Sequence, residues 1–163
     1  MKRVDFKSAK SLISKNDVVA MVVVIKHDSE EWNIIPVQWF TQTSLKPPMF
    51  AISIGHSRYS YLCLQEADEF NICIPKKELK NELLACATSS GKDVNKFVEF
   101  DIDYFYGRFK RVPIIKNSFV AFECKYVSQI KTGDHTIFIG ESKYSWLAKE
   151  TEDSYNYLSM KDL

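Results

Sequence analysis

The segment from Trp32 to Pro48 limits the fold of this chain more than any other stretch. It is rich in β-branched and aromatic residues, which favour extended backbone, but it carries Pro36 in its interior and ends in Pro47-Pro48. A proline cannot donate to the hydrogen-bond ladder of a sheet, so a central strand excludes it. The segment therefore predicts a strand that lies at the rim of a sheet or is broken there. Peptide groups that it leaves unpaired need other partners, and a flat polar ligand such as a heterocycle would provide them.

Length and composition are those of a folded protein. Of the 163 residues, 45% are hydrophobic and 13% aromatic, which predicts one domain over residues 1–163 with a core of its own. The C-terminal tail over about residues 149–163 is polar, and we expect it to fray or to lie across a partner subunit. The formal net charge is +1, which gives no field that would indicate nucleic acid or a membrane as partner.

Export and metal binding are not indicated either. The start Met1-Lys2-Arg3 resembles a signal peptide, but Asp5 and Lys7 interrupt the apolar region that export needs, so we expect a cytoplasmic protein. The four cysteines form no C-x-x-C pair and the three histidines lie far apart in the sequence, so we expect no metal site. The thiols should be buried and reduced, with Cys86 as the one candidate for a reactive thiol.

The hydrophobic pattern predicts strands joined mainly as antiparallel hairpins. Extended segments are expected over residues 18–26, 32–43, 49–54, 70–74, 119–127 and 129–141, the last with a turn at Gly133-Asp134. Helical spacing marks residues 61–67 and 78–87, the second with Leu79, Leu83, Leu84 and Ala87 on one face. The fold class is therefore all-β to α+β: an antiparallel barrel with inserted short helices.

Residues 55–60 have the composition of an anion-binding loop. A predicted strand ends at Gly55, and Ser57, Arg58 and Ser60 follow before a helix. Hydroxyls, a guanidinium and free backbone N–H groups at a helix start can hold an anion. The simpler interpretation is that Ser57 caps the helix, and the pattern by itself favours the cap.

A second polar loop covers residues 87–97. It combines the turn formers Ser89-Ser90-Gly91 with two lysines, and Asp93 is the expected N-cap of a short helix that carries Lys96. A C-capping glycine and a linker explain Gly91, but they do not explain the hydroxyls and lysines around it.

Residues 104–111 alternate aromatic and basic side chains. Such a run can stack on nucleobases, but it is more often a connector whose rings pack on the barrel while the charges stay in water. With a neutral total charge we favour the connector. In the next predicted strand we expect Glu123 and Lys125 to point outward.

The chain has no G-x-G-x-x-G, Walker, H-E-x-x-H or G-x-S-x-G motif. The segments 32–42, 57–59, 90–97 and 133–141, together with Pro47-Pro48, do resemble, in this order, the flavin reductase-like proteins of the flavoredoxin type. The likeness extends over about residues 18–141. Each motif is weak by itself, and the ordered set is specific.

This resemblance implies an FMN-binding split barrel that forms a homodimer, with the flavin in a groove between the barrel and the partner subunit. It implies that residues 33–43 line the flavin ring, that Ser57, Arg58 and Ser60 bind its phosphate, and that His135 faces the nicotinamide or the flavin. The cofactor-binding residues implied are Asn33, Gln38, Trp39, Phe40, Thr41, Gln42, Thr43, Ser57, Arg58, Tyr59, Ser60, Ser90, Lys92 and Lys96, and the catalytic residue is His135. Large residues such as Trp32 and Trp39 replace the small residues of many reductases, which favours tightly held FMN.

The function implied is that of an FMN-dependent oxidoreductase. Hydride from NADH or NADPH would reach the flavin, and electrons would leave to oxygen, a ferric complex, free flavin or a redox protein partner. Two alternatives stay open: an electron carrier or flavin store without a nicotinamide site, and a nucleic-acid-binding barrel that uses residues 104–111.

Overall fold

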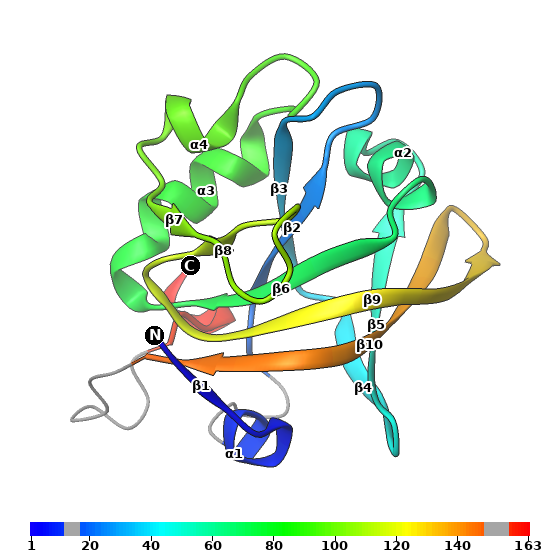
Figure 1. Cartoon of the computed structure of the whole chain (residues 1–163). Helices are drawn as coiled ribbons and strands as arrows, with labels where there is room; N and C mark the ends of the chain where they lie inside the picture. Colours follow the sequence, from blue (N-terminus) through cyan, green and yellow to red (C-terminus); the bar gives the residue numbers. More distant parts are fainter. Residues whose placement is uncertain (12–16, 149–156) are drawn as a thin grey trace.

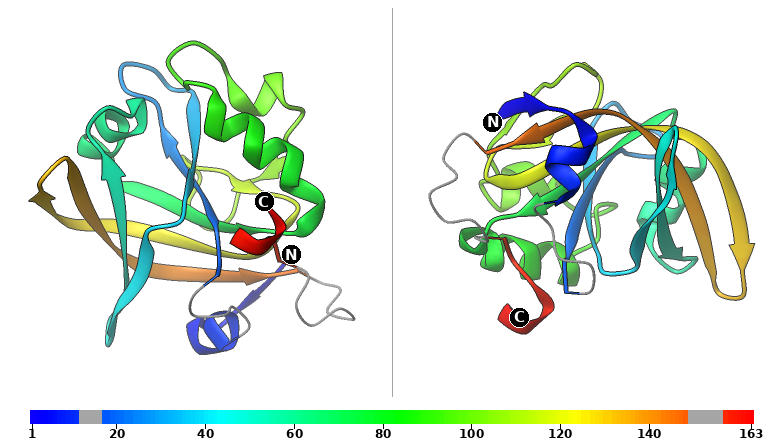
Figure 2. Two further views of the ribbon diagram at one scale, coloured as in Figure 1. Left: turned by 180° about the vertical axis from the view of Figure 1, so that it is seen from behind. Right: turned by 90° about the horizontal axis from the view of Figure 1, so that it is seen from below.

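The computed structural model describes residues 1–11, 17–148 and 157–163. Its main sheet has the strand order β3-β2-β6-β9-β10-β5-β4, and β1 pairs with β10. The sheet curls into an antiparallel split barrel with short helices around it, as predicted (Figures 1 and 2). The strands are β1 Lys2–Val4, β2 Ala20–Ile25, β3 Trp32–Val37, β4 Phe40–Leu45, β5 Pro48–Gly55, β6 Glu69–Pro75, β7 Tyr104–Phe105, β8 Ile114–Ile115, β9 Ser118–Thr132 and β10 His135–Leu147. The helices are α1 Phe6–Ser11, α2 Tyr59–Gln65, α3 Lys80–Thr88 and α4 Lys96–Glu99, with short 3-10 turns at η1 Lys77–Leu79 and η2 Met160–Asp162.

The core is divided between the two faces of the sheet, and β2 explains why its sequence is continuously apolar. Ala20, Val22 and Val24 point into the barrel interior, where they join Phe50 and Phe122. The alternate residues of β2 point to the other face and pack with the residues of α3 and α4. A strand buried on both faces needs apolar side chains at every position rather than at every second one.

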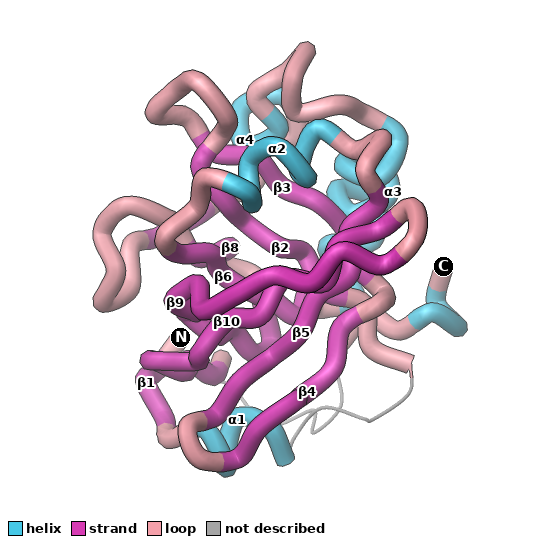
Figure 3. The backbone as a smooth tube through the Cα atoms, turned by 90° about the vertical axis from the view of Figure 1, so that its right-hand side faces the viewer, coloured by secondary structure: helices cyan, strands magenta, loops and turns pink. Residues whose placement is uncertain are grey.

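The proline-containing segment is broken, as its sequence predicts. β3 and β4 lie at opposite ends of the strand order, and Gln38 and Trp39 cross the open side of the barrel between them. The crossing is tied to β5, since Ser53 N donates to Trp39 O at 2.8 Å. In Figure 3 the β4–β5 hairpin extends away from α2, α3 and α4. β3 is the last strand of the sheet in the described ranges, so its outer side keeps a free edge, where Pro36 costs no ladder hydrogen bond.

Two helix details differ from the sequence-based prediction. In α3, Leu83 and Cys86 are buried but Leu84 is 40% exposed. The helix face that packs on β3 therefore contains Leu83 and Cys86, and not Leu84 as predicted. α4 is capped by Asn95, whose side chain accepts from Phe97 N at 3.2 Å. The prediction that Asp93 caps this helix was therefore wrong.

The aromatic–basic segment is a connector packed against the barrel. Trp32 of β3 contacts the rings of Tyr104 and Tyr106 at 5.2 and 6.0 Å between centroids, at angles of 57° and 69°, so the connector packs its rings against β3. The prediction that Glu123 points outward was wrong: this side chain is fully buried and accepts from the backbone N–H groups of Arg108 and Phe109 at 3.0 and 2.7 Å. Its carboxylate holds the connector to β9, which a strand pattern alone does not reveal.

The described end of the tail packs on its own chain. Leu158 is fully buried, its N–H donates to Pro75 O at 2.8 Å, and Ser159 forms a bridge with Val18. The expectation that the tail frays was therefore wrong for residues 157–163, and residues 149–156 lie outside the described part of the chain. None of the helices in the described ranges is long and apolar enough to cross a membrane.

Candidate functional site

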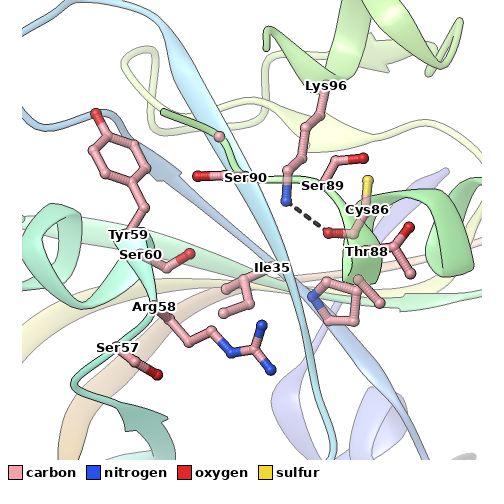
Figure 4. Close-up of a pocket in the computed structure, with 13 residues that line it drawn as sticks. Ile35, Ser57, Arg58, Tyr59, Ser60, Cys86, Thr88, Ser89, Ser90 and Lys96 are labelled. Atoms are coloured by element: carbon pink, nitrogen blue, oxygen red, sulfur yellow. Dashed lines mark hydrogen bonds between the residues drawn. The ribbon is translucent and has the colours of Figure 1, made fainter. Parts of the chain in front are cut away.

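A pocket of about 280 Å³ lies between β3, the start of α2 and the loop that joins α3 to α4. It brings together the two loops that the sequence marks as polar, which are far apart in the chain (Figure 4). Its lining consists of Ile35, Pro36, Ser57, Arg58, Tyr59, Ser60, Cys86, Ala87, Thr88, Ser89, Ser90, Gly91 and Lys96. We refer to it as the anion pocket.

The anion pocket contains cations and hydroxyls without carboxylates. Arg58 and Lys96 contribute the charges, and six of the lining residues carry a hydroxyl group. Within the described part of the chain neither cation forms an ion pair with a carboxylate. In Figure 4 the Arg58 side chain extends into the space below Lys96. Two unpaired cations that face one cavity favour an anionic ligand.

Lys96 is the buried member of this pair. It is 3% exposed, and its ammonium donates to Ile34 O and to Cys86 O, each at 2.7 Å. Burial lowers the pKa of Lys96, and the charge of Arg58 lowers it further. The two carbonyl groups use two of its three N–H donors, so one remains for a ligand.

The hydroxyls of Ser57, before α2, and of Ser60, within it, are available to a ligand. The N-cap of α2 is Arg58, and no side chain caps the helix. The interpretation of Ser57 as the cap, which the sequence alone favoured, was therefore wrong. Ser57 and Ser60 both line the anion pocket instead.

A groove of about 270 Å³ continues from the anion pocket towards the open side of the barrel. The two hollows share Ile35, Pro36 and Arg58, and the groove also includes residues 37–39, residues 53–55 and His135. We refer to it as the ring groove. The Trp39 ring lies 5.0 Å from the His135 ring at an angle of 37°. These two rings form its outer end.

His135 is held by its neighbour in the turn. Its Nδ1 lies 2.7 Å from Asp134 Oδ1, and this hydrogen bond lowers the pKa of Asp134. Nε2 lies on the side of Gly55, where a Cβ would come within 3.3 Å of it. The ring therefore presents Nε2 towards the ring groove.

The free edge of β3 adds backbone groups to both hollows. Peptide groups along an antiparallel strand alternate in direction, and Ile34 O points to the free edge because Lys96 binds it there. The carbonyl group of Pro36, two residues further along β3, therefore points to the same free edge, and Pro36 lines both hollows. Its carbonyl group is an acceptor for a ligand N–H.

A third hollow of about 250 Å³ is mainly apolar and adjoins Trp39. It lies along β4, β5 and β10 and is lined by Trp39, Phe40, Thr41, Ala51, Ile52, Ser53 and Ile137. Trp39 and Ser53 line both this hollow and the ring groove, so the two adjoin, and Trp39 is 62% exposed.

The structure groups most of the predicted site residues. Ser57, Arg58, Tyr59, Ser60, Ser90 and Lys96 line the anion pocket; Gln38, Trp39 and His135 line the ring groove; Trp39, Phe40 and Thr41 line the third hollow. Gln42, Thr43 and Lys92 line none of the three, and Asn33 lies buried behind the wall of the anion pocket. Ile35 and Pro36, which fall within the segment 33–43 that was expected to line the ring, border both hollows. Thr88 and Ser89 were not among the predicted site residues, although the run Thr88-Ser89-Ser90 was a visible signal.

Cys86 lines the anion pocket but does not have the properties of a reactive thiol. It is 1% exposed, and burial raises its pKa to about 11. A buried thiol that is protonated at neutral pH is a poor nucleophile. All four cysteines are buried and free, as predicted.

His27, Asp28 and Glu66 form a separate cluster whose side-chain ligand atoms lie within 4.8 Å of one another. His27 Nδ1 is 2.8 Å from Glu66, and Nε2 is 2.8 Å from Asp28. The hydrogen bond to Glu66 raises the pKa of His27. Both ring nitrogens of His27 are thus engaged by carboxylate oxygens, and the geometry is that of an ion-paired cluster.

Comparison with known proteins identifies the class to which this fold and site belong. The family model described as "Flavin reductase like domain" matches residues 16–160, and the chain belongs to this family. A solved structure of an FMN-binding protein from Thermus thermophilus, with bound 1-cyclohex-2-enone, is 26% identical with a TM-score of 0.75, over 90% of this chain and 83% of that one. Flavoredoxin from Methanosarcina acetivorans shares the fold, with a TM-score of 0.78 at 19% identity over 98% of this chain and 86% of that one.

Curated relatives match over part of their length. An uncharacterized protein of Archaeoglobus fulgidus is 33% identical over 112 residues, which is 69% of this chain and 63% of the relative. The FMN reductase (NADH) SmoA of Agrobacterium fabrum is 30% identical over 105 residues, 64% of this chain and 56% of SmoA. The matched part of the chain thus spans less than two thirds of these two proteins.

Proposed function

We propose that this protein is an FMN-dependent oxidoreductase that takes electrons from NADH or NADPH, or from a redox protein, and passes them to an acceptor. The observation that carries the proposal is the anion pocket without carboxylates, which joins the ring groove at Pro36 and Arg58. FMN has the matching shape: a phosphate dianion at one end of a ribityl chain and a planar polar ring at the other. The similarity to SmoA, whose name describes an FMN reductase (NADH), supports the proposal.

The residues present fit the phosphate. Arg58 is an exposed guanidinium without an ion-pair partner in the described ranges, and the hydroxyls of Ser57, Ser60 and Ser90 surround the same space. Charge-assisted hydrogen bonds from such donors are about twice as strong as neutral ones. In this proposal these residues bind the phosphate, and Lys96 adds its remaining donor from the buried side.

The ring groove fits a flat heterocycle. The free edge of β3 offers the carbonyl group of Pro36, and Gln38 and Trp39 border the same space. A bound flavin would supply the electron-transfer chemistry, while the protein orients it and tunes its potential. His135 and Trp39 close the outer end, where they would direct the electron donor to one face of the ring. Gln42, Thr43 and Lys92 are not part of this proposal.

We also propose a homodimer, because the apolar third hollow and the exposed Trp39 adjoin the ring groove on its open side. A second subunit would shield both from water. A molar mass near that of one 18.9 kDa chain in light scattering of the FMN-loaded protein would contradict the dimer.

The experiment for the proposed function is a visible spectrum of the purified protein with and without added FMN, followed by NADH or NADPH under argon. We expect bound oxidised flavin, and we expect it to lose its colour when either NADH or NADPH is added. A protein that retains no FMN after gel filtration would remove the proposal. Retained FMN that neither nicotinamide bleaches would favour the electron carrier instead.

A further inference from the structure

The buried side chain of Asn33 connects two walls of the anion pocket from behind. Asn33 Nδ2 donates to Ser60 Oγ at 2.7 Å, and both residues are buried. On the other side Oδ1 faces Gly91, where an added Cβ would lie only 1.9 Å from it. Ser60 and Gly91 line the anion pocket and Asn33 does not. Asn33 therefore acts on a ligand only through its neighbours.

The direction of this hydrogen bond determines what Ser60 offers to a ligand. Because the amide group of Asn33 donates to Oγ, the hydroxyl proton of Ser60 is free for another acceptor. Within the described part of the chain Ser60 Oγ donates to no protein atom, while Asn33 Oδ1 accepts no hydrogen bond. The hydroxyl therefore has a proton to donate on the side of the pocket.

The contact with Gly91 supports this amide orientation. A Cβ would collide with Oδ1, so a hydrogen of the Gly91 Cα points at this oxygen and forms a weak C–H···O contact. The reversed amide would place an N–H₂ group against the same C–H, with a buried donor left unpaired, which is costly.

We infer that Asn33 is a positioning residue for anion recognition: it fixes the Ser60 hydroxyl as a donor to the phosphate of the ligand. This inference rests on the proposed function, because it takes the anion to be the phosphate of FMN. It changes the role that the family resemblance implied for Asn33, from a residue that lines the flavin ring to one that prepares the phosphate site.

Riboflavin separates this role from a merely structural one, because it has the ring and ribityl chain of FMN but lacks the phosphate. Dissociation constants for both ligands would be measured on the full chain and on the variants Asn33→Ala, Ser60→Ala and the double variant. We expect Asn33→Ala to weaken FMN about tenfold more than riboflavin, the range of one charge-assisted hydrogen bond. In the Ser60→Ala background the same change should leave the ratio of the two constants unaltered.

Two further variants complete the design. Asn71→Ala is the matched control, because Asn71 is an equally buried asparagine that donates to Val112 O and Pro113 O at 3.0 Å each, outside the pocket. It should leave the FMN-to-riboflavin ratio unchanged. Asn33→Asp keeps the size of the side chain but accepts from Ser60 and reverses the hydroxyl. Asn33→Asp should weaken FMN binding more than Asn33→Ala does, and riboflavin should still bind. This variant tests the inference even if Asn33→Ala fails to fold.

The outcomes distinguish this inference from the proposed function. Equal losses of FMN and riboflavin affinity in Asn33→Ala would overturn the positioning role, and so would an unchanged ratio of the two dissociation constants in Asn33→Asp. In either case FMN binding by the wild type would leave the proposed function intact. A wild-type protein that binds neither ligand, or binds FMN no better than riboflavin, would overturn the proposed phosphate site itself.

Discussion

The two ends of α2 each face a cavity, and the two cavities differ in how their charges are compensated. At the start of the helix, the anion pocket holds Arg58 and Lys96 without a carboxylate. At its end, a cavity of about 470 Å³ contains five carboxylate residues together with Lys26 and Arg111. Both regions are polar and concave, so shape alone does not distinguish them.

Charge pairing does distinguish them. We refer to the cavity at the end of α2 as the acidic cavity. Of its lining residues, Lys26 pairs with Glu31 at 2.8 Å, Arg111 with Asp68 at 3.5 Å, and Glu66 with His27 at 2.8 Å. These cations pair with carboxylates, whereas Arg58 and Lys96 form no ion pair in the described part of the chain. Cations without carboxylate partners can bind an anionic ligand, and this difference makes the anion pocket the better candidate site for such a ligand.

Replacement of Arg58 should have the largest effect. Arg58→Ala should raise the dissociation constant for FMN about a hundredfold, the range of two charge-assisted hydrogen bonds, and it should leave the fold intact because the side chain is exposed. Fluorescence titration with FMN measures it. Arg111→Ala in the acidic cavity is the control and should not change FMN affinity. Equal effects of the two variants would remove the distinction between the cavities.

Replacement of Lys96 should lower stability. Lys96→Met leaves Ile34 O and Cys86 O without their donor, which should cost about 2 kcal/mol in the free energy of unfolding. Urea denaturation without ligand measures this difference. Lys26→Met, which removes only the ion pair with Glu31, should cost less than about 1 kcal/mol. A loss no larger for Lys96→Met would mean that water satisfies the two carbonyl groups.

Replacement of His27, which lies beside the acidic cavity, should have the smallest effect, a pH-dependent change in stability. Because the hydrogen bond to Glu66 raises the folded-state pKa of His27, its stabilisation is fully present below the unfolded pKa. It is lost as the pH rises through the folded pKa. The difference in thermal midpoint between the wild type and His27→Gln should therefore shrink from about pH 5 to about pH 8. A difference that stays constant over this range would contradict the assignment, and FMN affinity should not follow this titration.

Much of the fold could be predicted from the sequence. The hairpin of β9 and β10 follows from β-branched runs around a turn that contains Gly133, whose φ is +53°. The break at Gln38 and Trp39 follows from prolines that exclude a central strand. The buried Glu123 could not be predicted, because its partners are backbone N–H groups of a connector that only the folded chain brings over β9.

For the candidate site, the sequence indicated the two polar loops but not their roles. A Ser-Arg-x-Ser run before a helix has the same pattern whether its first serine caps the helix or lines a pocket, and the capping interpretation was wrong. The role of Asn33 could not be read from position either, since it depends on Ser60 and Gly91, which are 27 and 58 residues away in the chain.

The sequence by itself determined the elements: which segments are extended, where prolines keep a sheet edge open, and which loops carry hydroxyls and cations. These properties are local, because they depend on backbone sterics and on side chains a few residues apart. Only the tertiary structure decided that Arg58 and Lys96 face one cavity while the carboxylates lie at the other end of α2. Pairing of charges depends on distances in space, and the folded barrel sets those distances.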